Sequence, residues 1–283
     1  MKIASIHTAL GDEAALVDEQ RGVDLMSGIL PLPRSDAMNL LDPVAYATAV
    51  TAMESADRAH FQREASVRFA APYRSPRKIW GIGLNYVEHA GDLSEQVPSE
   101  PASFIKGDHT IIGPGDSIEL PHQSRRVTAE AELGLVIGRT CRNVSEADAL
   151  DYVWGVVPIL DQTAEDILQR NPRFLTRSKN FPTFFSFGPS IVPLKDVLRQ
   201  FGALDDIEVA TVKNGVVHRK NTVSNMTYKP AFLVSFHSEV MPLFPGDIIS
   251  TGTPGAVVIE DGDVVECRIA GVGTLVNPVR RSA

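Results

Sequence analysis

Short apolar runs separated by glycine and proline dominate the chain from Lys78 onward. The runs occupy residues 79–84, 117–120, 133–138, 154–160, 190–192, 207–212, 247–250 and 263–269. Apolar and β-branched runs of this length between turn residues are typical of strands. Asn214 and Gly215 stand between two β-forming runs and predict a hairpin. Helices are expected from Ser145 onward and over 228–241, so the pattern predicts an α+β, β-dominated domain.

The first 72 residues have a different pattern of apolar and polar positions and are predicted to form a small N-terminal α/β module. Two short apolar stretches before residue 20 suit a hairpin, and residues 43–63, rich in alanine, methionine and charged side chains, suit a helix. Prolines and basic residues punctuate the chain between 72 and 77. We therefore expect two domains, residues 1–72 and residues 73–283.

Charge and cysteine content exclude several classes of function. The net charge is −8, from 27 basic and 35 acidic residues, which argues against a nucleic-acid or anionic-membrane partner. Cys141 and Cys267 lie far apart in no ligand-like spacing, so we expect two buried apolar residues in a reducing cytoplasm. No apolar run approaches the 18 or so residues that a membrane span needs. We expect a cytoplasmic protein.

Two glutamates, Glu130 and Glu132, directly precede the apolar run 133–138. In a strand, residues two apart point to the same face, so the two carboxylates lie side by side. Like charges entering a buried strand repel each other unless a cation lies between them, and hard divalent cations prefer oxygen ligands. The alternative is a solvated strand end with two exposed glutamates. The local pattern alone does not decide between the two.

A third carboxylate, Asp161, follows the run 154–160, where a strand is expected to end. Side chains at this place are frequent site residues. The alternative is that Asp161 caps a helix over 162–169. Three carboxylates at buried strand positions favour a metal site. The lack of an accompanying cysteine or histidine favours Mg²⁺, Mn²⁺ or Ca²⁺ over zinc.

His89 and Asp92 follow a Gly-x-Gly segment that lacks the third glycine of a dinucleotide site. In a helical turn, residues three apart share a face, and a carboxylate beside a histidine raises its basicity. Such a pair suits a general base that activates water. A chance surface pair is the alternative. The polar, turn-rich segment 92–101 is compatible with a lid that orders when substrate binds.

Two later segments carry further candidate groups. Lys179 stands among aromatic and proline residues, in a stretch too rich in proline for a helix, and could offset the carboxylates or bind a substrate anion. The alternative is a core-packing loop from which the lysine reaches solvent. Residues 250–255 read as a strand end and a tight turn that exposes hydroxyl and N–H groups, where a substrate carboxylate could sit.

Taken in order, these segments resemble the fumarylacetoacetate hydrolase family. The matching stretches are 83–86 with His89, 104–106 with 112–116, 130–133, Asp161, Lys179 with 187–189, 251–254, and 262–265 before 273–275. Each motif is weak alone, but their ordered combination is specific. The resemblance covers roughly residues 78–279 and implies a mixed β-fold wound into a roll, usually homodimeric, with a magnesium or manganese ion.

The resemblance also implies roles for individual residues. By position, Glu130, Glu132 and Asp161 are implied as metal ligands, His89 with Asp92 as the water-activating base, Lys179 as a group that holds or polarises the substrate, and Tyr86, Lys106 and Thr253 as residues of the substrate cavity. Three positions depart from the pattern. Asp92 stands where glutamate is frequent, Leu160 where asparagine is common, and Glu165 where an arginine that can contact an anionic substrate is common.

The resemblance implies chemistry on small oxo-acids. We expect hydrolysis of a C–C bond in a 2,4-dioxo acid of the acylpyruvate or fumarylpyruvate type, because His89 is present. Decarboxylation of an oxaloacetate-like acid, and isomerisation or hydration of 2-hydroxyhepta-2,4-diene-1,7-dioate, are alternatives within the family. A non-catalytic protein that binds oxo-acids is a further alternative, which Glu165 and Leu160 favour.

Overall fold

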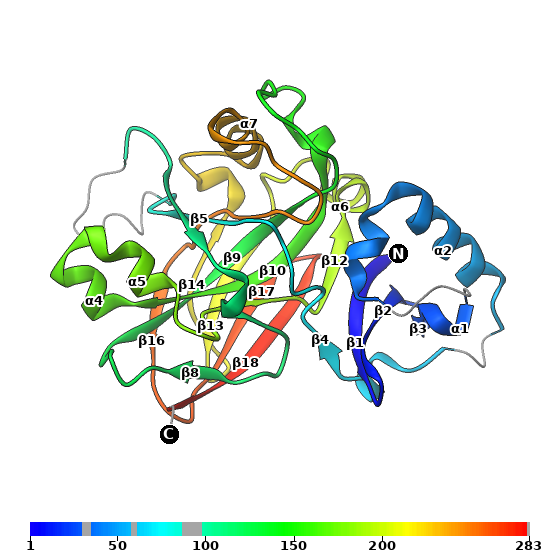
Figure 1. Ribbon diagram of the computed structural model, residues 1–283, viewed down its shortest axis with the longest axis horizontal. Helices are drawn as coiled ribbons and strands as arrows, with labels where there is room; N and C mark the ends of the chain where they lie inside the picture. Colours follow the sequence, from blue (N-terminus) through cyan, green and yellow to red (C-terminus); the bar gives the residue numbers. More distant parts are fainter. Residues whose placement is uncertain (30–34, 58–60, 87–97, 282–283) are drawn as a thin grey trace.

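The computed structural model describes residues 1–29, 35–57, 61–86 and 98–281, which form one large and one smaller sheet (Figure 1). Thirteen strands of the described chain belong to the large sheet, whose main path runs β3-β2-β1-β12-β10-β9-β15-β5-β6. The smaller sheet has the order β14-β13-β17-β18-β8. Strands dominate and only a few helices cover them, so the predicted fold class is confirmed.

The strands and helices have the following bounds. The large sheet contains β1 (Lys2–Thr8), β2 (Gly11–Asp18), β3 (Gly22–Leu25), β4 (Phe69–Ala70), β5 (Ile79–Gly83), β6 (Ala102–Lys106), β7 (Ile111–Ile112), β9 (Val127–Ile137), β10 (Val153–Ala164), β11 (Phe185–Phe187), β12 (Ser190–Pro193), β15 (Ile248–Ser250) and β16 (Ala256–Ile259). The smaller sheet contains β8 (Ile118–Leu120), β13 (Glu208–Lys213), β14 (Val216–Thr222), β17 (Val264–Ile269) and β18 (Gly273–Arg281). The helices are α1 (Met26–Ile29), α2 (Pro43–Ser55), α4 (Glu165–Arg170), α5 (Leu175–Lys179), α6 (Leu194–Phe201) and α7 (Pro230–Val240). None of these helices has the length and apolar character that crossing a membrane requires.

The antiparallel pair β9 and β10 forms the centre of the molecule. The two strands pair from Val127 opposite Ala164 to Ile137 opposite Val153. One face of β9 presents apolar side chains such as Ala131 and Leu133 to a core shared with the smaller sheet. The opposite face carries the polar residues at alternate positions, because successive strand residues point to opposite sides. This alternation separates the main core from the candidate site.

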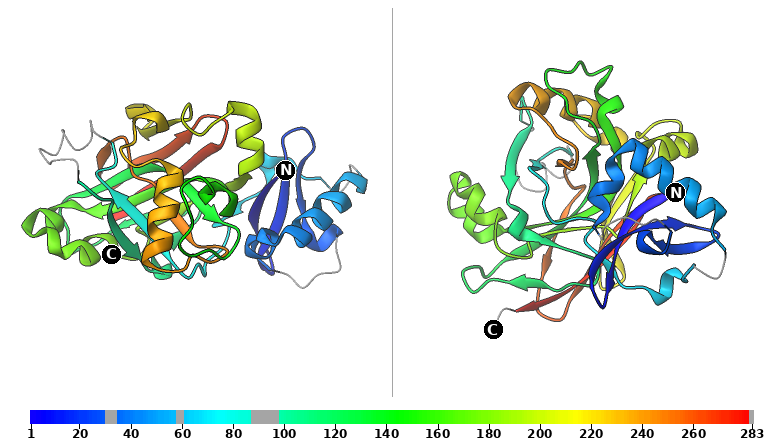
Figure 2. Two further views of the ribbon diagram at one scale, coloured as in Figure 1. Left: turned by 90° about the horizontal axis from the view of Figure 1, so that it is seen from above. Right: turned by 45° about the vertical axis from the view of Figure 1, so that its right-hand side comes forward.

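The N-terminal strands extend the large sheet. β1 pairs with β2 in the predicted hairpin and with β12 in the large sheet, where Ile3 lies opposite Ile191. In Figures 1 and 2, β1–β3 and α2 lie beside the roll. The domain boundary near 72–77 stays a prediction. On either side of it, Leu16 and Phe187 belong to one apolar cluster.

Several local predictions can be compared with the described elements. The Asn214-Gly215 hairpin is confirmed, with φ of 53° and 77° at its two turn residues. Both cysteines are buried and free, as expected. The helix expected over 43–63 ends at Ser55. No α-helix forms from Ser145; this part of the described chain has only a short 3₁₀ turn at Ala149–Tyr152.

Candidate metal and active site

Three carboxylates come together on the polar face of β9 and β10. Glu130 and Glu132 are two apart on β9, and Asp161 on β10 lies directly opposite Glu130. Residues opposite each other in an antiparallel pair point to the same face. One potential ligand oxygen from each side chain lies within 4.8 Å of the other two. The register therefore places three oxygen donors where a single cation can contact them all.

Asp161 lies inside β10 rather than at its end. The strand continues to Ala164, and α4 begins at Glu165 with Ala164 in the cap position, so the helix-cap alternative for Asp161 is wrong. Its side chain is completely buried. A buried carboxylate needs compensating charge or hydrogen bonds. Its surroundings must therefore supply them.

Hydrogen bonds from neighbouring residues hold the carboxylates of Glu132 and Glu130. Glu132 Oε2 accepts hydrogen bonds from Ser250 Oγ at 2.5 Å and from the Gly252 backbone N–H at 2.9 Å. Burial and the neighbouring carboxylates raise the pKa of Glu132 to about 8. Glu130 Oε1 accepts a hydrogen bond from Thr163 Oγ1 at 2.6 Å. These contacts orient the two glutamates before any ligand binds.

Two buried lysines face the carboxylates. Lys106, at the end of β6, donates a short hydrogen bond to Asp161 Oδ1 and another to the Gln162 carbonyl at 3.1 Å. Lys179, at the end of α5, donates to Asp161 Oδ2 at 2.7 Å and to Glu130 Oε2 at 3.1 Å. Lys179 is thus the last residue of a short helix, so the expectation of a non-helical stretch is wrong for residues 177–179 and confirmed for residues 180–189.

The two lysines differ in their protonation. Burial lowers the pKa of Lys106 to about 8, against the opposing effect of Asp161. Burial also opposes the charged form of Lys179, but its several carboxylate neighbours outweigh burial and raise the pKa of Lys179. Lys179 is therefore the firmly charged partner of the cluster.

The donor set fits a hard divalent cation. Three carboxylates and two ammonium groups carry a formal charge of −1, so a divalent cation makes the site +1. In the described part of the chain, the ligand atoms of this cluster are all carboxylate oxygens, which suits Mg²⁺ or Mn²⁺ better than a thiolate-seeking metal. A net positive, largely buried site is suited to an anionic ligand.

The remaining predicted residues fall into two groups. Thr253 is buried in the turn that leads to β16. The turn lies next to the carboxylate cluster, because Gly252 donates to Glu132 and Ala256 of β16 pairs with Glu130 of β9. Tyr86 is buried, and burial followed by the charge of Glu132 raises the pKa of its hydroxyl. His89 and Asp92, and most of the suggested lid, lie outside the described residues.

Asn85 is a site-forming residue that the sequence analysis did not single out by role. Its side-chain amide donates to the carbonyls of Thr251, at 2.7 Å, and Tyr228, at 2.9 Å. Its Oδ1 accepts from the Tyr228 N–H at 2.8 Å. Asn85 therefore joins the end of β5 to the 251–255 turn and to the start of α7. An isolated asparagine in sequence gives no signal of such partners.

The charge reversal at Glu165 is matched by Arg126. Arg126 Nε donates to Glu165 Oε2 at 2.5 Å, and Gln169 Nε2 donates to Glu165 Oε1 at 3.1 Å. The negative charge of Glu165 is thus paired with the positive charge of Arg126, its neighbour across the strand pair.

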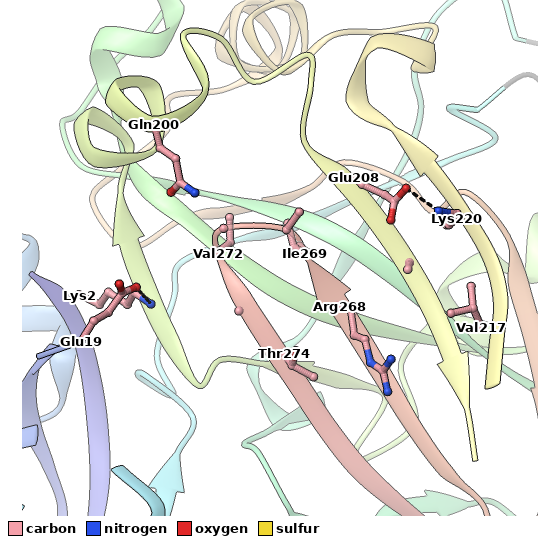
Figure 3. A pocket seen from close by; sticks show the side chains of 14 residues that line it. Lys2, Glu19, Gln200, Glu208, Val217, Lys220, Arg268, Ile269, Val272 and Thr274 are labelled. Atoms are coloured by element: carbon pink, nitrogen blue, oxygen red, sulfur yellow. Dashed lines mark hydrogen bonds and ion pairs between the residues drawn. The ribbon is translucent and has the colours of Figure 1, made fainter. Parts of the chain in front are cut away.

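A separate cavity of about 660 Å³ lies at the smaller sheet, away from the carboxylates (Figure 3). Its three labelled cationic side chains are already paired with acids. The pairs are Lys2 with Glu19, Lys220 with Glu208, and Arg268 with Glu266. Each of these cations thus faces an acid, so the cavity carries no excess positive charge, and the carboxylate cluster remains the candidate site.

Residues 78–280 match the family model described as fumarylacetoacetate (FAA) hydrolase, C-terminal. The chain belongs to this family. The matched residues contain all three carboxylates and both lysines of the site. This FAA hydrolase family protein therefore carries its candidate site within the family's own domain, as the resemblance implied.

Relatives of this FAA hydrolase family protein include enzymes with different activities. A mitochondrial oxaloacetate tautomerase of Xenopus laevis is 34% identical over 244 residues, which is 83% of this chain and 75% of that protein. A 2-hydroxyhepta-2,4-diene-1,7-dioate isomerase from Mycobacterium marinum is 32% identical, with a TM-score of 0.76 over 100% of this chain and 99% of that one. A maleylpyruvate hydrolase from a Sphingobium species, solved with manganese and pyruvate, is 25% identical, with a TM-score of 0.82 over 100% of both chains.

Proposed function

We propose that this FAA hydrolase family protein is a divalent-metal-dependent enzyme that shifts a proton between carbon and oxygen in a 2-oxo dicarboxylic acid. Such a reaction is an isomerisation or a keto–enol tautomerisation. The observation that carries the proposal is the pair of buried ammonium groups, Lys106 and Lys179, on the carboxylate cluster. Buried cations of this kind favour an anionic substrate and the negative charge that forms on its oxygen.

Glu130, Glu132 and Asp161 are the residues that would hold the cation. A cation bound there would act as a Lewis acid toward the 2-oxo group of the substrate. Lys179, firmly charged between Asp161 and Glu130, would stabilise negative charge that develops on the substrate oxygen. The Ser250 hydroxyl and the Gly252 N–H would keep Glu132 in place during this change.

The relatives support a proton shift over C–C cleavage as the first choice. The tautomerase and the isomerase, at 34% and 32% identity, are nearer in sequence than the hydrolase at 25%. Hydrolysis of an acylpyruvate, the first expectation from sequence, is the second candidate. It is favoured by His89 in the sequence and by the manganese-bound and pyruvate-bound hydrolase. The native metal is proposed to be Mg²⁺ or Mn²⁺.

The reactions leave different products, so one assay separates them. Oxaloacetate and acetylpyruvate are supplied in deuterium oxide with magnesium, and the products are followed by proton NMR and enol absorbance. A tautomerase or isomerase speeds the enol–keto change of oxaloacetate and exchanges its C3 protons without forming pyruvate. A hydrolase releases pyruvate and acetate from acetylpyruvate.

A matched pair of lysine variants tests the site itself. Lys179→Met should abolish the accelerated reaction, whereas Lys220→Met, which removes an exposed lysine from the smaller sheet, should leave it unchanged. Pyruvate release without oxaloacetate enol–keto acceleration would replace the proposal by the second candidate. No reaction with either acid, in the presence of magnesium or of manganese, would reject both.

A further inference from the structure

We infer that Arg126 binds the second carboxylate of the substrate and so selects dicarboxylic over monocarboxylic 2-oxo acids. This inference rests on the proposed function, because it concerns the far end of the same substrate. Arg126 lies immediately before β9, and its carbonyl accepts a ladder hydrogen bond from the Glu165 N–H at 2.9 Å. It is therefore still in register with the strand pair that carries the carboxylate cluster.

The strand pair forms a polar stripe that leads from the buried carboxylates to Arg126. Residues two apart on a strand share a face, so Arg126, Thr128 and Glu130 follow one another on the same side of β9. Thr128 Oγ1 donates to Glu130 Oε1 at 3.3 Å, which is consistent with this order. The side chain of Asp161 is 1% exposed and that of Glu130 13%, Thr128 is buried, and the side chain of Arg126 at the end of the stripe is 50% exposed. The same strand face thus carries the candidate metal site and, at its exposed end, an arginine.

Glu165 orients the guanidinium of Arg126 without using all of its donors. Arg126 Nε donates a hydrogen bond to Glu165 Oε2 at 2.5 Å. Neither terminal nitrogen of Arg126 has a hydrogen-bond partner among residues 1–29, 35–57, 61–86 and 98–281. A guanidinium fixed through Nε presents its outer nitrogens to a second carboxylate, and arginine binds carboxylates well in this way.

The spacing suits a short dicarboxylic chain. Glu130 is four positions after Arg126, which gives about 14 Å between their Cα atoms at the rise of an antiparallel strand. A long arginine side chain that leans along the strand direction covers part of this interval. An acid with its 2-oxo carboxylate at the cluster and its second carboxylate five or six carbons away would bridge the remainder. Arg125, one residue earlier, is also exposed but lies in the bend before β9, where its backbone N–H donates to Asp166 Oδ2 at 3.3 Å, so it provides a matched control.

The test compares two ligands that differ only in the far carboxylate. Binding of 2-oxoadipate and of 2-oxohexanoate to the magnesium-loaded protein is measured by calorimetry, so that the readout does not depend on turnover. We expect the wild-type protein to bind the diacid about tenfold or more tightly, the usual scale of a charge-assisted pair. Arg126→Gln should remove this preference and leave the affinity for the monoacid unchanged. Arg125→Gln should keep it.

A double variant distinguishes a specific loss of diacid binding from a folding defect caused by an unpaired Glu165. Arg126→Gln with Glu165→Gln removes both charges together, leaves no unpaired glutamate, and should lose the same preference. The inference is overturned if Arg126→Gln still prefers the diacid, if Arg125→Gln loses the preference equally, or if the wild-type protein binds both acids alike. If the wild-type protein binds neither acid, the proposed function fails and the role of Arg126 fails with it.

Discussion

Removal of the Lys179 charge should destabilise the metal-free protein strongly, and magnesium should reverse most of the loss. The Lys179 ammonium contacts Asp161 at 2.7 Å and Glu130 at 3.1 Å, and its side chain is only 6% exposed. Breaking a buried ion pair by removing one partner costs about 3–5 kcal/mol, because the other charge stays buried. Lys106 still compensates part of that charge, so we expect a loss near 3 kcal/mol for Lys179→Met.

A bound divalent cation would supply the charge that Lys179→Met removes. Magnesium should therefore stabilise the variant more than the wild-type protein, by about 1.4 kcal/mol for each tenfold gain in affinity. Urea unfolding, followed by the fluorescence of Trp80 and Trp154, is measured with EDTA and with excess magnesium. For each protein, the difference between the free energies of unfolding in the two buffers gives the stabilisation by magnesium.

An exposed pair provides the control for this experiment. Lys220 and Glu208 are 2.9 Å apart, with side chains 59% and 44% exposed, so Lys220→Met should cost at most about 1 kcal/mol in either buffer. The predicted role of the Lys179 charge would be refuted if Lys179→Met lost no more stability than Lys220→Met. It would also be refuted if magnesium raised the stability of Lys179→Met and of the wild-type protein by the same amount.

Three further predictions concern other parts of the site and the fold. Ser250→Ala removes one of the two hydrogen bonds on Glu132 Oε2 and should weaken magnesium binding by about 10–100-fold in calorimetry, with a normal unfolding curve. Burial lowers the pKa of His237 below its usual 6.5. The unfolded chain then binds more protons, so this residue makes stability fall as the pH drops below 6.5, and His237→Asn should flatten that decline in unfolding titrations. Gly155→Ala places a Cβ 2.2 Å from the Val192 carbonyl oxygen and should lower the free energy of unfolding by about 1–3 kcal/mol; unchanged thermal stability would contradict it.

Strand character and the grouping of carboxylates could be predicted from the sequence because both depend on short-range spacing. Glu130 and Glu132 share a face by alternation alone, and Asn214-Gly215 specifies its own turn. The family follows from the order of several short motifs along the chain, and the family match over 78–280 confirms it. These features need no knowledge of which strand pairs with which.

The contacts that complete the site depend on register and on long-range closure. Lys106 and Asp161 are 55 residues apart, and Ser250 and Glu132 are 118 apart. Nothing in either local sequence indicates these partners. The expected end of the strand at Asp161 was wrong for a related reason: pairing with β9 continues β10 to Ala164, although the apolar run stops at Leu160. Tertiary pairing decides such boundaries where local composition does not.

The pairing of β1 with β12 has a consequence for attempts to express residues 73–283 alone. Without β1, the short strand Ser190–Pro193 would become a free edge on that side, with Ile191 and the nearby Phe187 no longer covered by the N-terminal residues. Unpaired backbone next to apolar side chains is a template for strand addition between molecules. We expect such a truncated protein to aggregate even with an intact site, so the N-terminal strands protect solubility as well as extending the sheet.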